Sequence, residues 1–170
     1  MANLTTQQFV GPVTGIAIAI PPNWQSKILR PSPEAPTELY QCPPAKQHSP
    51  QIVVQVIPIP VEEYYEGSYR DLAAELILEQ QEASLNGSIR EIDQREVTID
   101  GYAARVDVFS YIDPDSDTSI IQYQVCVQMA SAVGAIVGSV TTAEMMQYLP
   151  IFEAAENSLD LSHYINKSEK

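Results

Sequence analysis

Three glutamines, Gln55, Gln122 and Gln124, are the residues whose spacing most clearly suggests chemistry, namely hydrogen bonding to a partner. Gln122 and Gln124 alternate along one predicted strand, which places both amides on the same face. An amide donates and accepts, so such a row can satisfy the main chain of a bound segment. With Val54 and Ile120 nearby to contact apolar side chains, these residues predict a partner-binding site. The alternative is an ordinary solvated face of an antiparallel sheet.

Residues for acid–base or nucleophilic chemistry form no familiar constellation. His48 lies in a proline-rich segment and His163 near the C-terminus, and we expect neither to have a fixed neighbourhood. Nucleophile elbows, phosphate-binding loops and Cys/His metal clusters are absent from the sequence. Asp113, Asp115 and Asp117 begin like a calcium loop, but the required glycine and final glutamate are missing. We therefore expect no enzyme and no cofactor, with a solvated turn at these aspartates and weak metal binding as the alternative.

Length and composition indicate one acidic globular domain. The 170 residues include 45% hydrophobic and 18% charged residues, which is typical of a folded protein. The net charge of −13 makes nucleic acids and anionic membranes unfavourable partners. A solubilising acidic surface explains this charge, and a basic partner is the alternative. We predict a single domain over 1–161 and a polar tail at 162–170.

No segment of the sequence is suited to entering a membrane or directing export. The apolar run at 16–22 is too short to cross a bilayer, and no lysine or arginine precedes it. Cys42 and Cys126 do not form the disulfide framework of a small secreted protein, and we expect Cys126 to be a buried thiol. These features predict a cytoplasmic protein without direct membrane insertion.

The order of elements predicts an α+β fold, with an antiparallel β-sheet of about six strands flanked by two helices. Asp100-Gly101 favours a tight hairpin, because both central residues of its turn need positive φ. An amphipathic helix is expected over 68–86 and a second over 142–159. The expected strands are 13–20, 52–57, 89–99, 102–111, 120–129 and 132–140.

Residues 30–50 form the longest predicted loop. Six prolines in this stretch exclude a regular helix and leave room for one short extended piece near 39–41. Such loops often carry function, so this Pro-rich loop is an alternative binding surface to the sheet face. Just before it, Trp24 follows a proline pair, and we expect its indole to close one end of the core.

The order and spacing of these motifs resemble the Mog/PsbP-like superfamily, and within it the DcrB-type proteins. The resemblance covers residues 13–161, and it implies an antiparallel sheet packed by helices in a protein that binds and does not catalyse. No catalytic residues of the family exist to be transferred to this chain. The motifs that carry the resemblance are Pro21-Pro22-Asn23-Trp24, Ile99-Asp100-Gly101-Tyr102, Tyr148-Leu149-Pro150-Ile151-Phe152 and Asn157-Ser158-Leu159.

Different branches of this superfamily imply different partners. Eag-type chaperones are cytoplasmic and shield apolar segments of secreted effectors, PsbP-like proteins associate with photosystem II, and Mog binds a small GTPase. The resemblance implies a chaperone or adaptor that binds an effector segment on its sheet face. The alternative is a photosystem-associated assembly or accessory protein that binds a subunit of a membrane complex. The Pro-rich loop at 30–50 departs from compact Eag-type proteins, and the lack of a leader departs from lumenal PsbP-like proteins.

Overall fold

The computed structural model describes residues 5–32, 34–58, 70–71, 73–75, 77–78, 89–129 and 132–164. Its strands are β1 (Gln7–Val10), β2 (Ala17–Ile20), β3 (Gln25–Arg30), β4 (Thr37–Gln41), β5 (Gln51–Pro58), β6 (Arg90–Ile99), β7 (Tyr102–Asp113), β8 (Thr118–Gln128) and β9 (Ala132–Thr141). The 3-10 turn η1 (Thr142–Glu144) leads into helix α2 (Met145–Ser158). Residues 70–71, 73–75 and 77–78 are also helical, and we refer to them as the 70–78 helix.

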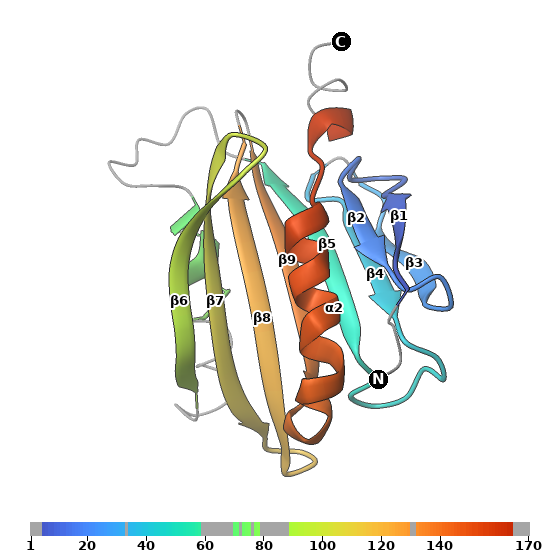
Figure 1. Ribbon diagram of the computed structural model, residues 1–170, viewed down its shortest axis with the longest axis vertical. Helices are drawn as coiled ribbons and strands as arrows, with labels where there is room; N and C mark the ends of the chain where they lie inside the picture. Colours follow the sequence, from blue (N-terminus) through green and yellow to red (C-terminus); the bar gives the residue numbers. More distant parts are fainter. Residues whose placement is uncertain are drawn as a thin grey trace.

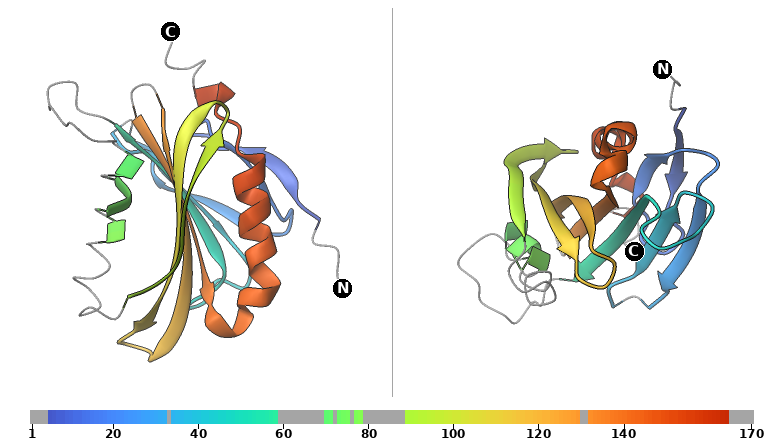
Figure 2. Two further views of the ribbon diagram at one scale, coloured as in Figure 1. Left: turned by 60° about the vertical axis from the view of Figure 1, so that its left-hand side comes forward. Right: turned by 90° about the horizontal axis from the view of Figure 1, so that it is seen from below.

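Seven strands form one antiparallel sheet in the order β3-β4-β5-β9-β8-β7-β6, and β1 pairs with β2 in a small second sheet (Figure 1). Helix α2 lies against one face of the large sheet, which we call the inner face. The 70–78 helix lies against the opposite, outer face (Figure 2). The predicted α+β fold with a helix-flanked antiparallel sheet is therefore confirmed.

The main core fills the space between the inner face, α2 and the β1–β2 sheet. The strands contribute apolar side chains to this core, because every second residue of β5 and β8 points toward the inner face. Trp24 is buried in this core, and its ring centroid lies 6.5 Å from that of Tyr148. The large side chains of the main core include those of Ile16, Ile18, Ile52, Val54, Val125, Ile151 and Phe152.

Gly138 on β9 allows α2 to approach the sheet closely. A Cβ atom at this position would lie 2.8 Å from Cδ1 of the buried Phe152 ring. We expect Gly138→Ala to lower the free energy of unfolding by about 1–3 kcal/mol, because a packed core cannot accept the extra methyl group. Urea denaturation followed by circular dichroism measures this loss. Gly134→Ala is the control, since its nearest contacts would be 3.4 Å away, and equal losses for both variants would contradict the explanation.

Most expected elements are present, with four differences in the N-terminal half. The strand expected over 13–20 begins only at Ala17, and β1 was not among the expected strands. The Asp100-Gly101 hairpin has φ values of 51° and 81°, as its turn requires. The short extended piece expected near 39–41 is part of the full strand β4, and β3 was not expected at all. The remainder of the helix expected over 68–86 lies outside the described residues, as do residues 165–170 of the polar tail.

The described cysteines are free thiols, and Cys126 is buried as expected. Burial in the low-dielectric interior raises the pKa of the Cys126 thiol to about 12, which keeps it protonated and unreactive at neutral pH. Cys42 is half-buried, and its sulfur lies 3.8 Å from the hydroxyl of Tyr148. Within the described part of the chain, no helix is both long and apolar enough to span a bilayer.

Candidate functional site

The three predicted glutamines lie on the outer face, in neighbouring rows of the sheet. Gln122 pairs in register with Ser139, Gln124 with Val137, and Gln55 with Ala135. They therefore share one face, but that face is not open at Gln122 and Gln124. Their exposed fractions are 3% and 0%, whereas Gln55 is half-buried.

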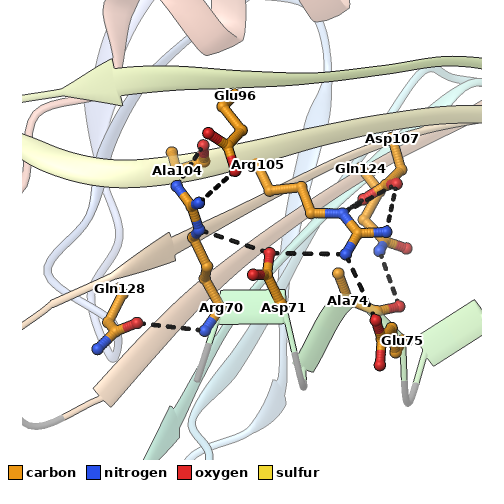
Figure 3. Close-up of polar contacts among 10 residues, drawn as sticks. All are labelled: Arg70, Asp71, Ala74, Glu75, Glu96, Ala104, Arg105, Asp107, Gln124 and Gln128. Atoms are coloured by element: carbon orange, nitrogen blue, oxygen red, sulfur yellow. Dashed lines mark hydrogen bonds and ion pairs between the residues drawn. The ribbon is translucent and has the colours of Figure 1, made fainter. Parts of the chain in front are cut away.

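The 70–78 helix covers this part of the outer face and contacts its amides (Figure 3). The Gln124 side-chain amide donates to the main-chain carbonyl of Ala74 over 3.4 Å, and the Gln122 amide donates to Gln124. Farther along, the backbone N–H of Arg70 donates to the Gln128 side chain. The predicted open surface at Gln122 and Gln124 is therefore wrong, because a segment of the same chain occupies it.

The two apolar residues predicted for the partner-binding site lie on different faces of the sheet. Val54 is fully buried on the inner face, because it neighbours Gln55 along β5 and strand residues alternate. Its predicted place beside the glutamines is therefore wrong. Ile120 does share the outer face with Gln122, and it is buried beside a hollow near the β7–β8 turn.

Charged side chains join the 70–78 helix to the outer face. Arg105 on β7 binds Asp107 in a forked pair, with Nε 3.0 Å from Oδ2 and Nη2 3.0 Å from Oδ1, and both residues are buried. The other terminal nitrogen of Arg105 lies 3.5 Å from Asp71 and 3.8 Å from Glu75 of the helix. Arg70 extends the network to Glu96 on β6, at 2.7 Å.

This network is better explained as a helix attachment than as a binding site. The Arg105 guanidinium faces three carboxylates, so no unpaired positive charge remains to hold an anion. Burial raises the pKa of the Asp107 carboxyl, and Arg105 opposes that rise. The sequence does contain a signal for this pair, because Arg105 and Asp107 alternate within a largely apolar strand and must share one face.

A polar hollow of about 270 Å³ lies on the same face, beside the β7–β8 turn. His48, expected to have no fixed neighbourhood, is held there with Nε2 3.0 Å from Asp113 and 2.9 Å from Ser116. Asp113 also accepts from the backbone N–H of Asp115, and this bond is the main cause of its lowered pKa. Among the described residues, no three His, Cys, Asp or Glu side chains gather in a way that could hold a metal ion.

The two edges of the large sheet offer a different kind of surface, made of main-chain groups. Strands β3 and β6 each have one neighbour in the sheet, so every second residue directs its N–H and C=O away from the sheet. All six residues of β3 are exposed, including Ile28 at 44% and Leu29 at 48%. The β6 edge is mostly charged and carries one comparably exposed apolar residue, Ile92, at 53%.

An apolar groove of about 330 Å³ runs beside β3 on the inner side. Its floor includes Tyr40, whose pKa is raised to about 12 by burial and by Glu38, so the phenol remains protonated at neutral pH. Its wall includes the buried Glu38, which accepts from the backbone N–H groups of Val13 and Thr14 at 2.7 and 3.0 Å. The groove is lined by Phe9, Val10, Pro12, Ser26, Lys27, Ile28, Glu38 and Tyr40.

The chain shares its fold with solved proteins of low sequence identity. CyanoP, the cyanobacterial PsbP of Synechocystis sp. PCC 6803, matches with a TM-score of 0.63 and 13% identity over 92% of each chain. The chain has a PsbP-like fold. PA94 of Pseudomonas aeruginosa, of unknown function, matches with a TM-score of 0.60 and 13% identity over 91% of this chain and 96% of its own.

A third structure extends the PsbP-like fold to a cell-envelope protein. LpqN, which is involved in cell envelope biogenesis in Mycobacterium tuberculosis, matches with a TM-score of 0.56 and 15% identity over 91% of this chain and 89% of its own. No protein-family model and no curated protein matches the sequence. At these identities the shared feature is the fold alone, so membership of the superfamily and the branch within it both stay predictions.

Proposed function

We propose that this protein is a non-enzymatic protein-binding module that takes an extended segment of another protein along the free edge of β3. Such a segment would add an eighth strand to the large sheet through main-chain hydrogen bonds. Its inward-facing side chains would enter the groove beside Ile28 and Tyr40. The role would be that of a chaperone or adaptor, as in the DcrB-type and Eag-type resemblance.

The observation that carries this proposal is that every residue of β3 is exposed. An edge strand usually exposes few apolar residues, because its unpaired main-chain groups can hydrogen-bond to a strand of another molecule. Here Ile28 and Leu29 are each nearly half exposed on that strand, and an apolar groove adjoins it. On the outer face, by contrast, Gln122 and Gln124 are buried, and the 70–78 helix contacts Gln124. The edge therefore offers both open hydrogen-bonding groups and apolar surface without any rearrangement.

Site-specific photocrosslinking tests this function. A photoreactive phenylalanine analogue in place of Ile28 should give, in cells of the source organism, a discrete adduct on ultraviolet irradiation. The same analogue in place of Ile92 is the matched control, because Ile92 is comparably exposed on the opposite edge. Discrete adducts from position 28 that are absent from position 92 would support the proposal. No adduct at position 28, or the same adducts at both positions, would contradict it.

Association with photosystem II is a second candidate, and the likeness to CyanoP favours it. It differs from the first in the partner, a subunit of a membrane complex instead of a free protein segment. Native gel electrophoresis of solubilised photosynthetic membranes separates the two, because a photosystem accessory protein should migrate with the complex. Migration solely at the size of the free protein would argue against it.

A further inference from the structure

The β3 edge carries positive charge that no described carboxylate neutralises through an ion pair. Lys27 and Arg30 are two of nine basic residues in a chain of net charge −13. In the described part of the chain, Arg70, Arg95 and Arg105 are all ion-paired, whereas Lys27 and Arg30 contact no carboxylate. Two unpaired cations therefore stand together on one exposed strand.

A β-bulge aligns these two cations. The register places Lys27 opposite Leu39 and Ile28 opposite Glu38, but then Arg30 opposite Thr37, so Leu29 is an extra residue. Leu39 and Thr37 are two apart on β4 and share the outer side of the sheet. Their partners Lys27 and Arg30 consequently share that side too, which a regular strand would not allow for residues three apart.

Ile28 occupies the opposite, inner side, because its register partner Glu38 is buried there beside the groove. The two sides of the β3 edge thus have different chemistry. The outer side presents two cations by register, and the inner side presents one exposed apolar side chain next to an apolar groove, which Lys27 also borders. A strand added to this edge would contact the cations with one set of alternate side chains and the groove with the other set.

We infer that the partner segment is acidic on one side and apolar on the other, an inference that rests on the proposed strand addition. Its carboxylates face Lys27 and Arg30 on the outer side, and a large apolar side chain between them enters the groove. At physiological salt, electrostatic screening acts over about 8 Å, so carboxylates of the chain that lie farther away than this have little effect on a segment bound beside Lys27 and Arg30. A second copy of this chain fits poorly, because its own Lys27 and Arg30 would approach the same cations.

Synthetic peptides with one alternating apolar pattern test this chemistry. Eight-residue peptides that alternate valine with glutamate, serine or lysine would be titrated into the ¹⁵N-labelled protein, with amide shifts of β3 as the readout. The glutamate peptide should bind about fivefold more tightly than the serine peptide, since two exposed ion pairs each contribute modestly. The lysine peptide should bind more weakly than both, and the advantage of glutamate should vanish at 1 M salt, where the screening length falls to about 3 Å.

Variants separate the partner chemistry from the strand addition itself. Lys27→Gln with Arg30→Gln should remove the advantage of the glutamate peptide and leave the affinity for the serine peptide unchanged. Arg90→Gln, which removes an exposed cation from the opposite edge, should change neither. Equal binding of all three peptides would overturn the acidic partner while leaving strand addition intact. If no peptide shifted the β3 amides, the strand addition would fail as well.

The cations have one competing explanation, which the same double variant tests. Lysine and a bulge on an edge strand can serve to prevent sheets from pairing with each other. In that case Lys27→Gln with Arg30→Gln would self-associate in sedimentation experiments, and its affinity for the glutamate peptide would equal that of the unaltered protein. That result would overturn the inference.

Discussion

Replacing Arg105 by methionine should lower the free energy of unfolding by about 3–5 kcal/mol at pH 7. The methionine side chain keeps the apolar volume but leaves the buried Asp107 without its forked partner. An uncompensated charge in a low-dielectric site is far more costly than the ion pair that it replaces. The 70–78 helix would also lose the contacts of Asp71 and Glu75 with the guanidinium. Urea denaturation followed by circular dichroism measures the loss.

The loss in Arg105→Met should also shrink as the pH falls. Burial already raises the pKa of Asp107 when Arg105 is present, and removing the cation raises it further. Above that pKa, folding must bury a charged carboxylate, and below it the buried group is neutral. The variant should therefore approach the unaltered protein in stability toward acidic pH. A gap that stays constant or widens on acidification would contradict this explanation.

The double variant Arg105→Met with Asp107→Leu is the matched control. It removes both charges together, and apolar replacement of a whole buried pair is often neutral or stabilising. We expect its unfolding free energy to return to within about 1–2 kcal/mol of the unaltered protein. If the double variant were as unstable as Arg105→Met alone, lost packing and not the unpaired charge would explain the effect.

Replacing Glu38 by alanine should cost about 3 kcal/mol or more, because one buried carboxylate satisfies three donors. It accepts from the backbone N–H groups of Val13 and Thr14, and from the Thr14 hydroxyl at 2.8 Å. Without it, these donors lose their partner in a region where water has little access. The loop between β1 and β2 would lose its attachment to β4, and the groove beside β3 would lose one wall. Thermal and urea unfolding measure the loss.

Two further variants test the explanation for Glu38. Glu38→Gln keeps one acceptor oxygen for the backbone donors, so it should cost less than about 1.5 kcal/mol. Gly11→Ala should imitate the loss, because its Cβ would lie 2.0 Å from a carboxylate oxygen of Glu38 and displace it. A loss below about 1 kcal/mol for Glu38→Ala would contradict the assigned role.

The sequence predicted the central strands well because their side chains alternate between a core and a second surface. β5, β8 and β9 read as strands on this basis, and Asp100-Gly101 determined the hairpin between β6 and β7. β3 escaped prediction because it buries no residue on either face, so its residues show no period of two. Its place in the sheet follows from pairing with β4, which is a tertiary contact.

The candidate site could be predicted in part. Alternation alone put Gln122 and Gln124 on one face, but it cannot tell whether solvent or protein covers that face. The helix that covers it turns charged residues such as Asp71 toward the sheet, where Arg105 meets them. The same helix also packs Ala73, Ala74 and Ile77 into an apolar cluster with the outer face. Its amphipathic pattern indicates that one side of the helix is buried, but it does not say which surface of the sheet that side contacts. The placement of Lys27 and Arg30 on one side of β3 could not be predicted from the sequence either, because it depends on a β-bulge.

The hydrogen bond from Gln124 to the Ala74 carbonyl means that the 70–78 helix binds the outer face as an internal ligand. The amide contacts a main-chain group, which is the contact the sequence predicted for a foreign segment. Covalent linkage presents that internal ligand at an effective concentration on the order of millimolar. A foreign segment at micromolar concentration would need an affinity roughly a thousandfold higher than the internal one to occupy the same surface. Competition, and not absence of complementarity, therefore disfavours an external segment at the outer face, and the proposed site at the sheet edge has no such internal competitor among the described residues.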